Sequence, residues 1–176
     1  MNRRHFLGLA LSAATMPALA GRSGYQQPRV LSMHHAHTKE SIRVVYRTGN
    51  FYQRDELQKL NHFLRDFRTG EVVNLDVRLF DLLYDIKRHL GYASEPIQIL
   101  SAYRSSRTNA MLRKTSRWVA RNSLHVQGKA LDIRFPGVST RQLRNSAVAL
   151  NRGGVGFYPS DNFVHVDTGS IRHWTS

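Results

Sequence analysis

Two histidines and one carboxylate stand at positions where they could together hold a metal ion. His125 comes just before a predicted strand that carries Asp132, and His165 lies in a second predicted strand. If these strands pair, the three side chains meet around one point. Asp167 then lies beside them, because residues two apart on a strand share a face. Two imidazoles, one carboxylate and an open fourth position are the donor set of a catalytic zinc site.

Spacing alone leaves a second interpretation open. A histidine and an aspartate seven residues apart occur often by chance, and most single histidines lie on the surface or are satisfied in a core. The chain has no cysteine, which excludes disulfides, thiolate metal sites and a cysteine nucleophile. Any metal must therefore be held by His, Asp or Glu. A zinc ion held in this way lowers the pKa of its bound water to about 7 and polarises a carbonyl group.

The elements that must position these residues can be read from the periodicity of apolar side chains. Apolar residues recur at helical spacing, and Asp76 is of the residue type that caps helix N-termini. We expect helices over residues 54–68, 77–90, 108–114 and 140–151, and strands over residues 43–47, 97–101, 130–135 and 163–167. Helices first and strands mainly later favour an α+β single domain. Its sheet is expected to be antiparallel and to bear the zinc site, with helices packed around it.

The first twenty residues are expected to be a secretory signal peptide. Arg3 and Arg4 precede a mostly apolar stretch, residues 6–14, which is too short for a transmembrane helix. Residues 18–20 (Ala-Leu-Ala) form a small-x-small cleavage site. Adjacent arginines followed by Phe-Leu resemble a twin-arginine export signal, and an ordinary Sec signal that happens to hold two arginines is the alternative.

The chain is strongly basic, with 26 Lys and Arg against 12 Asp and Glu. Removing residues 1–20 lowers the net charge from +14 to +12, because that segment carries two arginines and no acid. An exported chain of this charge should be attracted to an anionic envelope polymer, although a merely solvated basic surface is the alternative. We expect no nucleic-acid partner and no integral membrane segment. Residues 21–29 are polar and are expected to form a flexible leader before one domain over residues 30–176.

Five short motifs in a fixed order carry a resemblance to a known family. They are Ser101-Ala102-Tyr103-Arg104-Ser105, Ser123-x-His125-x-x-Gly128-x-Ala130-x-Asp132, Gly153-Gly154-Val155-Gly156-Phe157-Tyr158-Pro159, His165-Val166-Asp167-Thr168-Gly169 and Arg172-x-Trp174. The chain resembles the exported murein endopeptidases of the zinc DD-peptidase and hedgehog superfamily, from about residue 31 to residue 174. The His-x-x-Gly-x-Ala-x-Asp element is specific in combination with the downstream His-Val-Asp.

The resemblance implies a Zn²⁺ metallopeptidase of the periplasm that hydrolyses peptide cross-links or stem peptides of peptidoglycan. His125, Asp132 and His165 match the metal ligands of that superfamily. Arg104 matches an arginine that faces the substrate, where it could hold a substrate carboxylate or steady the tetrahedral oxyanion. Residues 30–176 would be the zinc peptidase domain, acting as a monomer on peptidoglycan. Which cross-link is cut, D-alanine to diaminopimelate or diaminopimelate to diaminopimelate, stays open.

The chain departs from this family at the general base. Many relatives have a Glu three residues before the last ligand histidine, but here that position is Asn162, which cannot take a proton. Asp167 is the preferred candidate for the catalytic base and Asp161 is the second. The missing Glu also leaves an alternative function open, that of a catalytically inactive peptidoglycan-binding module. A milder departure is Ala102, where relatives often have Gly.

Three further residues are candidates around the site. Tyr158 is expected to line the substrate groove. His37, which follows His34 and His35, and His173 near the C-terminus are candidates for supporting the metal site from outside the ligand set. A polar strand end and simple packing are the respective alternatives for these two histidines.

Overall fold

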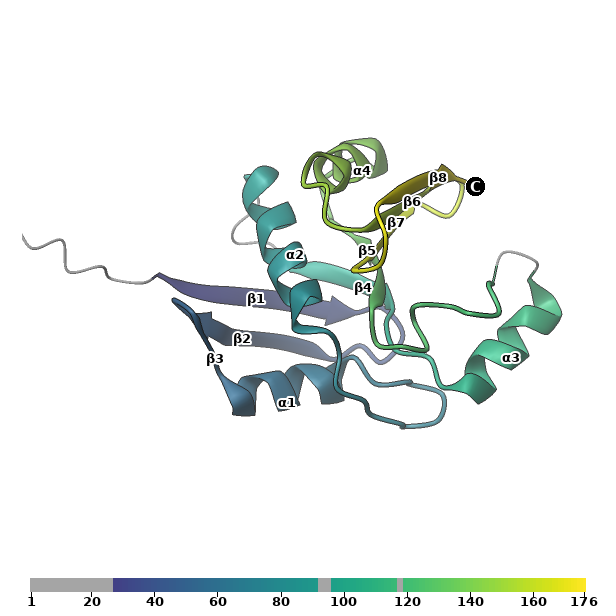
Figure 1. The fold of residues 1–176 in the computed structure, drawn as a ribbon, viewed down its shortest axis with the longest axis horizontal. Helices are drawn as coiled ribbons and strands as arrows, with labels where there is room; N and C mark the ends of the chain where they lie inside the picture. The colour runs from purple at the N-terminus through teal and green to yellow at the C-terminus, as the bar shows by residue number, and fades with distance from the viewer. Residues whose placement is uncertain (1–26, 92–95, 117–118) are drawn as a thin grey trace, which may run out of the picture.

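Eight strands of the described residues form one sheet, with helices packed on it (Figure 1). The computed structural model describes residues 27–91, 96–116 and 119–176, so the expected signal peptide and most of the expected leader lie outside the described residues. The strands are β1 (Pro28–His35), β2 (Ser41–Thr48), β3 (Phe51–Tyr52), β4 (Ile97–Ser101), β5 (Ala130–Arg134), β6 (Gly154–Tyr158), β7 (Phe163–Asp167) and β8 (Arg172–Thr175). The helices are α1 (Arg54–Phe63), α2 (Val77–His89), α3 (Ser106–Thr115) and α4 (Thr140–Ala149).

The sheet is mixed, with the strand order β3-β2-β1-β4-β5-β7-β6-β8. Neighbouring strands run antiparallel except for β1 with β4 and β6 with β8, which are parallel. The single α+β domain agrees with the sequence prediction, and most strand pairs are antiparallel as expected, but two pairs are parallel. The parallel β6–β8 pair arises because β8 continues past the β6–β7 hairpin and pairs with the free edge of β6, in the direction of that strand.

Most expected elements form close to their expected bounds. β4 and β7 have the bounds that the pattern predicted, and Asp76 caps α2 by accepting a hydrogen bond from the Arg78 backbone N–H at 3.0 Å. β1, β3, β6 and β8 were not predicted. β1 begins at Pro28, two residues inside the expected flexible leader.

Helix α1 ends at Phe63, five residues before the expected end, and a buried aspartate organises the turn that follows. Asp66 is 1% exposed, and its carboxylate accepts hydrogen bonds from the backbone N–H groups of Ser105 at 2.8 Å and Arg68 at 3.0 Å. Burial works to raise the pKa of Asp66, but hydrogen bonds, among them those from Thr108 and Ser105, outweigh it and hold the pKa at about 2. The turn is thereby fixed to the start of α3.

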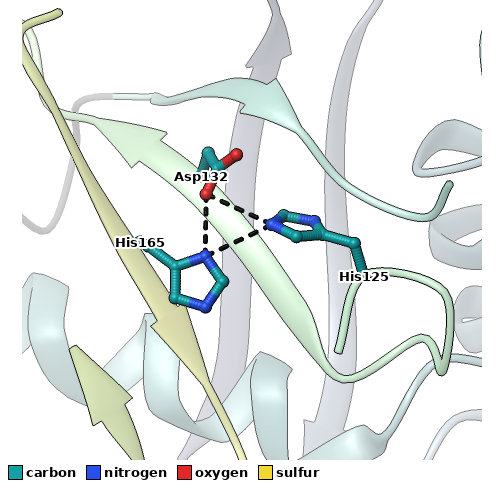
Figure 2. A group of neighbouring side chains, drawn as sticks. All are labelled: His125, Asp132 and His165. Atoms are coloured by element: carbon teal, nitrogen blue, oxygen red, sulfur yellow. Dashed lines mark hydrogen bonds and ion pairs between the residues drawn. The ribbon is translucent and has the colours of Figure 1, made fainter. Parts of the chain in front are cut away.

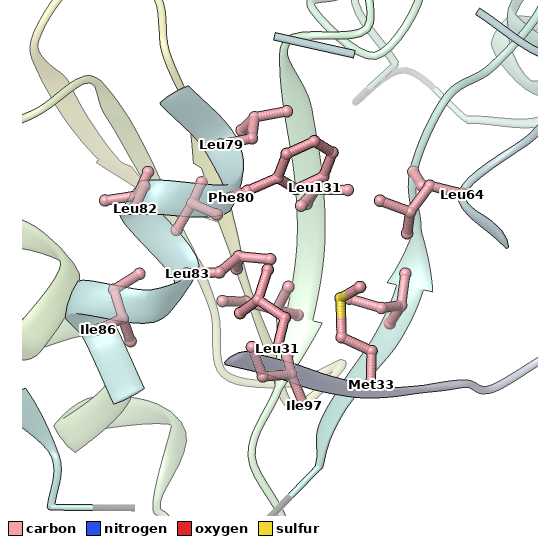
Figure 3. Packing of buried hydrophobic residues seen from close by; sticks show 14 of the residues in the cluster. Leu31, Met33, Leu64, Leu79, Phe80, Leu82, Leu83, Ile86, Ile97 and Leu131 are labelled. Atoms are coloured by element: carbon pink, nitrogen blue, oxygen red, sulfur yellow. The ribbon is translucent and has the colours of Figure 1, made fainter. Parts of the chain in front are cut away.

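The apolar core lies between α2 and the sheet (Figure 3). Leu79, Leu83 and Ile86 of α2 are fully buried, as are Leu31 of β1 and Ile97 of β4. Full burial of such a side chain contributes about 1.5–3 kcal/mol. This core gives the sheet a rigid backing. Within the described residues, no helix has the length and apolar character needed to cross a membrane.

The other face of the sheet carries polar residues. Leu131 and Ile133 of β5 and Val164 and Val166 of β7 belong to the core cluster. Because side chains alternate along a strand, the residues between them point to the opposite face. Asp132 and His165 are those residues.

Candidate metal centre

A row of paired residues crosses the sheet from β4 to β8. The register pairs Ser101 with Asp132, and Asp132 with His165. It continues from His165 to Gly156 and from Gly156 to Trp174. Residues in such a row lie side by side on one face of the sheet. The two strands that the sequence predicted to pair therefore do so with Asp132 directly opposite His165.

Three donor atoms converge at this row (Figure 2). His125 Nε2 lies 3.2 Å from His165 Nδ1 and 3.3 Å from Asp132 Oδ1, and His165 Nδ1 lies 2.9 Å from Asp132 Oδ1. All three residues are buried. A tetrahedral zinc ion with bonds of about 2.0–2.1 Å separates its ligand atoms by about 3.3 Å. The triangle thus has nearly the size of one face of such a tetrahedron.

The outer nitrogens of both imidazoles are already occupied. His125 Nδ1 donates to the carbonyl oxygen of Ala102 at 2.7 Å, and His165 Nε2 donates to Asp167 Oδ2 at 3.1 Å. In a neutral imidazole the other ring nitrogen then carries a lone pair. Two lone pairs and a carboxylate oxygen therefore point at one another, and this arrangement requires a cation or a proton between them. The donor set fits a divalent metal ion.

The pKa values show how a proton can occupy the cluster when it holds no metal. Burial lowers the pKa of His125 and also opposes ionisation of Asp132, but the two histidines outweigh burial and hold the pKa of Asp132 well below its usual range. Burial would lower the pKa of His165 too, yet its hydrogen bonds to the carboxylates of Asp132 and Asp167 raise it. Metal binding would displace a proton from this group.

Asp167 lies on the far side of the His165 ring from the three donor atoms. It is 0% exposed and accepts hydrogen bonds from the backbone N–H groups of Gly154 and Gly169 and from both terminal nitrogens of Arg172. Burial works to raise the pKa of Asp167, but His165 and Arg172 outweigh it and hold the pKa far below normal. The sequence analysis preferred Asp167 as the catalytic base, but this placement turns its carboxylate away from the cluster.

Arg104 is bound to the outer oxygen of the cluster's carboxylate. Its Nη2 donates to Asp132 Oδ2 at 2.9 Å, and its Nε donates to Ser101 Oγ at 2.9 Å. Its side chain is 13% exposed and lines the cleft beside the cluster. Because Asp132 Oδ2 is held in this way, Asp132 Oδ1 is the oxygen that faces the two histidines.

A cleft of about 300 Å³ opens beside the three donor residues. Tyr158 lines it together with Phe163 and Trp174. The Tyr158 ring stacks on Phe163 with centroids 4.4 Å apart, and its hydroxyl accepts a hydrogen bond from Trp174 Nε1 at 3.0 Å. Asp161 also lines the cleft, and no described residue is bonded to its carboxylate. The cleft thus has an aromatic wall, an exposed carboxylate and the donor triangle.

Trp174 and Gly156 were missed as site residues. The Trp174 ring centroid lies 5.2 Å from that of His165, and a Cβ added to Gly156 would stand 2.5 Å from the indole carbons Cε2 and Cζ2. Position 156 must therefore be glycine for the indole to pack there. Arg172 and Trp174 are two residues apart, so on a strand their side chains share a face, and both line the cleft. This spacing is the signal that could have placed Trp174 in the cleft from the sequence.

Two sequence candidates, His37 and His173, and the departing position Asn162 do not contribute to the donor triangle. The His37 ring stacks on Phe67 with centroids 4.6 Å apart, outside the residues that line the cleft. His173 alternates with Arg172 and Trp174 on β8, is exposed, and does not line the cleft. Asn162 Oδ1 accepts a hydrogen bond from the Thr140 hydroxyl, so this side chain is engaged at the start of α4.

The chain is similar to known proteins over almost its whole length. The model of an M15 peptidase family described as "Peptidoglycan L,D-endopeptidase MepK" matches residues 23–174. The peptidoglycan L,D-endopeptidase MepK of Escherichia coli K12 is 44% identical over 177 residues, covering 98% of this chain and 97% of that protein. The probable peptidoglycan L,D-endopeptidase MepK of Haemophilus influenzae is 38% identical, covering 98% of this chain and 95% of that protein. No solved structure gives a significant match.

Proposed function

Because this chain belongs to the peptidoglycan L,D-endopeptidase MepK family of M15 metallopeptidases, we propose that it hydrolyses L,D peptide bonds in peptidoglycan with a zinc ion held by His125, Asp132 and His165. The observation that carries the proposal is the donor triangle, with sides of 2.9, 3.2 and 3.3 Å, in the lining of a cleft. The nitrogen and oxygen donors suit zinc, and three protein ligands leave a fourth position open, as catalytic zinc sites require.

The bound zinc would lower the pKa of a water molecule and polarise the carbonyl group of the substrate. The residues of the chain hold and orient this chemistry. Ala102 and Asp167 fix the two imidazoles so that one lone pair of each faces the metal position. Arg104 fixes Asp132 in the same way, and from its place in the cleft it is available to the substrate's carbonyl oxygen or carboxylate.

We assign the role of proton acceptor to Asp161 in place of Asp167. A general base must reach the attacking water, and Asp167 is enclosed behind the His165 ring with its oxygens occupied. Asp161 is exposed, lines the same cleft as the donor triangle and has a carboxylate without a described partner. Tyr158 would contact the substrate from the aromatic wall.

The expected substrate bond follows from the chemistry of L,D cleavage. An L,D bond joins the carbonyl of an L-configured centre to the amine of a D-configured centre. The cross-link between two diaminopimelate residues is of this kind, whereas the bond from D-alanine to diaminopimelate joins two D centres. We therefore favour the diaminopimelate cross-link, which the sequence analysis left open.

The alternative function, an inactive peptidoglycan-binding module, is not favoured. A module that had lost catalysis would have no need to keep three donor atoms converging in a buried cluster. The full-length similarity to proteins named as endopeptidases also supports an enzyme.

The decisive experiment uses the mature chain, residues 21–176, and two purified muropeptide dimers. One dimer carries the diaminopimelate–diaminopimelate cross-link and the other carries D-alanine–diaminopimelate. We expect the first to be split faster, activity to stop on chelation and zinc alone to restore it. Turnover that survives complete metal removal, as checked by elemental analysis, would refute the metal mechanism, and faster cleavage of the second dimer would refute the L,D assignment.

Action in the periplasm by a monomer, after twin-arginine export, completes the proposal. The paired residues Arg3 and Arg4 support this export route. Replacing both by lysine should leave the precursor in the cytoplasm, as read by cell fractionation. Export through the Sec pathway would instead leave the fractionation unchanged.

A further inference from the structure

The cleft is bordered by a projecting segment that the catalytic mechanism does not use. We define the basic arm as α3 with the described residues 119–122. Figure 1 shows α3 standing out from the sheet at the side of the molecule. Thr108 and Asn109 are the buried residues in α3, so most of the helix is presented to solvent. The cleft beside the donor triangle is lined by Val119, Ala120 and Asn122 of the arm, and by Ser116, which directly follows α3. A ligand lying on the arm would therefore be continuous with one in the cleft.

The arm is held to the protein at its base. The Ser105 hydroxyl caps α3 by accepting a hydrogen bond from the Thr108 N–H, while the Ser105 N–H donates to the buried Asp66. Farther along, Asn109 Nδ2 donates to the carbonyl oxygen of Ala120 at 3.1 Å, which ties the helix to the segment that returns to the cleft. The exposed face of α3 thus has a defined position relative to the catalytic cleft.

The charge of the arm is uncompensated. Residues 96–131 contain seven Lys or Arg and no Asp or Glu. On the arm, Arg107, Arg113, Lys114 and Arg121 are exposed, and none of them makes an ion pair with a described residue. Some arginines elsewhere are paired with acids, as Arg152 is with Asp85 at 2.7 Å.

The helix dipole does not account for this charge. Cations are favoured near the C-terminus of a helix, where Arg113 and Lys114 lie. Arg107 lies in the first turn, where the dipole disfavours a cation, and Arg121 lies beyond the helix. An anionic partner outside the protein would compensate all four charges.

We propose that the basic arm binds the carboxylates of peptidoglycan stem peptides next to the one being cut. This inference rests on the proposed function, because it takes the polymer in the cleft to be peptidoglycan. Stem peptides carry free carboxylates at short intervals, and the arm borders the cleft in which one stem would lie. The arm then raises affinity for the polymer while the cleft performs the chemistry, so its contribution depends on neighbouring stems and on salt.

The test compares two triple variants of equal charge change. The arm variant carries Arg107→Gln, Arg113→Gln and Lys114→Gln. The matched control carries Arg43→Gln, Arg88→Gln and Arg141→Gln, which are also exposed, make no ion pair with a described residue and do not line the cleft. Each is assayed on intact sacculi and on a soluble diaminopimelate-cross-linked dimer, and thermal unfolding checks that both variants fold.

We expect the arm variant to raise KM for sacculi by about three- to tenfold with a weaker dependence on salt, and to leave turnover of the soluble dimer unchanged. The control should behave like the parent on both substrates. Equal effects of the two triple variants, or an equal loss on both substrates, would overturn the proposal. So would undiminished sedimentation of the arm variant with sacculi, or binding of the parent to anionic lipid vesicles as strong as to sacculi.

A parent chain without turnover on either substrate would instead overturn the proposed function. Sedimentation of the same variants with sacculi would then still decide whether the arm binds the polymer.

Discussion

The pair His125–His165 and the pair His35–His37 are built from the same side chains but have opposite surroundings. Their ring centroids are 5.0 Å and 6.0 Å apart, respectively. In the first pair, one nitrogen of each ring faces Asp132. In the second, the rings pack against aromatic side chains, with His37 stacked on Phe67. Proximity of two histidines therefore says little about metal binding, and the direction of their nitrogens decides it.

The backbone and neighbouring side chains set that direction. His35 Nδ1 accepts hydrogen bonds from the backbone N–H groups of His37 at 3.2 Å and Thr38 at 3.3 Å, so its proton is on Nε2. That buried nitrogen has no hydrogen-bond partner among the described residues. Burial lowers the pKa of His35 to about 4. In the metal centre, by contrast, the outer nitrogens donate to acceptors, and the inner ones are left with lone pairs.

The largest expected effect separates the two pairs directly. Replacing His165 by alanine removes one of three donors, so zinc binding should be lost and hydrolysis should fall at least about a thousandfold. His37→Ala should change both by less than about twofold, because this side chain lies outside the cleft. Elemental analysis and hydrolysis of a muropeptide dimer give the two readouts. A comparable loss of zinc from the His37 variant would break the comparison.

The next effect concerns Asp161, the exposed carboxylate in the cleft beside the His125–His165 pair. Asp161→Asn should lower kcat by about 10²–10⁴-fold while zinc content stays normal, because a base is lost and no ligand is. Asp55→Asn, an exposed change on α1 away from the cleft, is the control. A fully active Asp161 variant would remove this residue from the mechanism.

Asp167→Asn should have an intermediate effect of a different kind. The amide keeps the shape of the side chain but loses the charge that orients His165, so we expect zinc affinity to weaken by about 10–100-fold. Competition with a metal chelator measures this. If zinc affinity stayed normal while kcat collapsed, Asp167 would be the base that the sequence analysis preferred.

The sequence predicted the convergence of the donor residues because strand alternation is a local property. The segments around Asp132 and His165 alternate apolar and polar residues, so their pairing and facing could be deduced. What the outer nitrogens contact could not be deduced. The partner of His125 is the backbone carbonyl of Ala102, and no side-chain pattern marks a carbonyl as an acceptor. The far-side position of Asp167 follows from the rotation of the His165 ring, which sequence does not encode locally.

The unpredicted strands have a similar explanation. β6 contains Gly154 and Gly156, which suggest a turn, but here they leave room for the Asp167 carboxylate and the Trp174 indole. β8 is short and largely exposed, and it gains strand character from pairing with β6. The early end of α1 likewise depends on Asp66 bonding to Ser105, a contact between residues 39 apart. Such tertiary partners override local periodicity.

The smallest effect expected on activity, but a clear one on stability, comes from His35. Its pKa is about 4 in the folded protein, against 6.5 for the free side chain, because burial disfavours the charged form, with help from the nearby His37 and opposition from Glu40. Between these two pH values the unfolded chain binds more protons than the folded one. The free energy of unfolding therefore falls as the pH drops from 6.5 to about 4, with a contribution from His35 of about 3 kcal/mol.

Urea unfolding at several pH values measures this contribution as a difference between parent and variant. His35→Gln should abolish it. The variant should also start from a lower stability at neutral pH, since the two backbone N–H groups of residues 37 and 38 lose an acceptor. His37→Gln should keep the slope of the parent, because the ring that must stay neutral is still present. Equal slopes for the parent and the His35 variant would show that the buried imidazole is protonated as easily as an exposed one. The two histidine pairs would then no longer differ in charge. Burial against phenylalanines keeps the His35 ring neutral, whereas Asp132 and Asp167 favour the protonated form of the His165 ring.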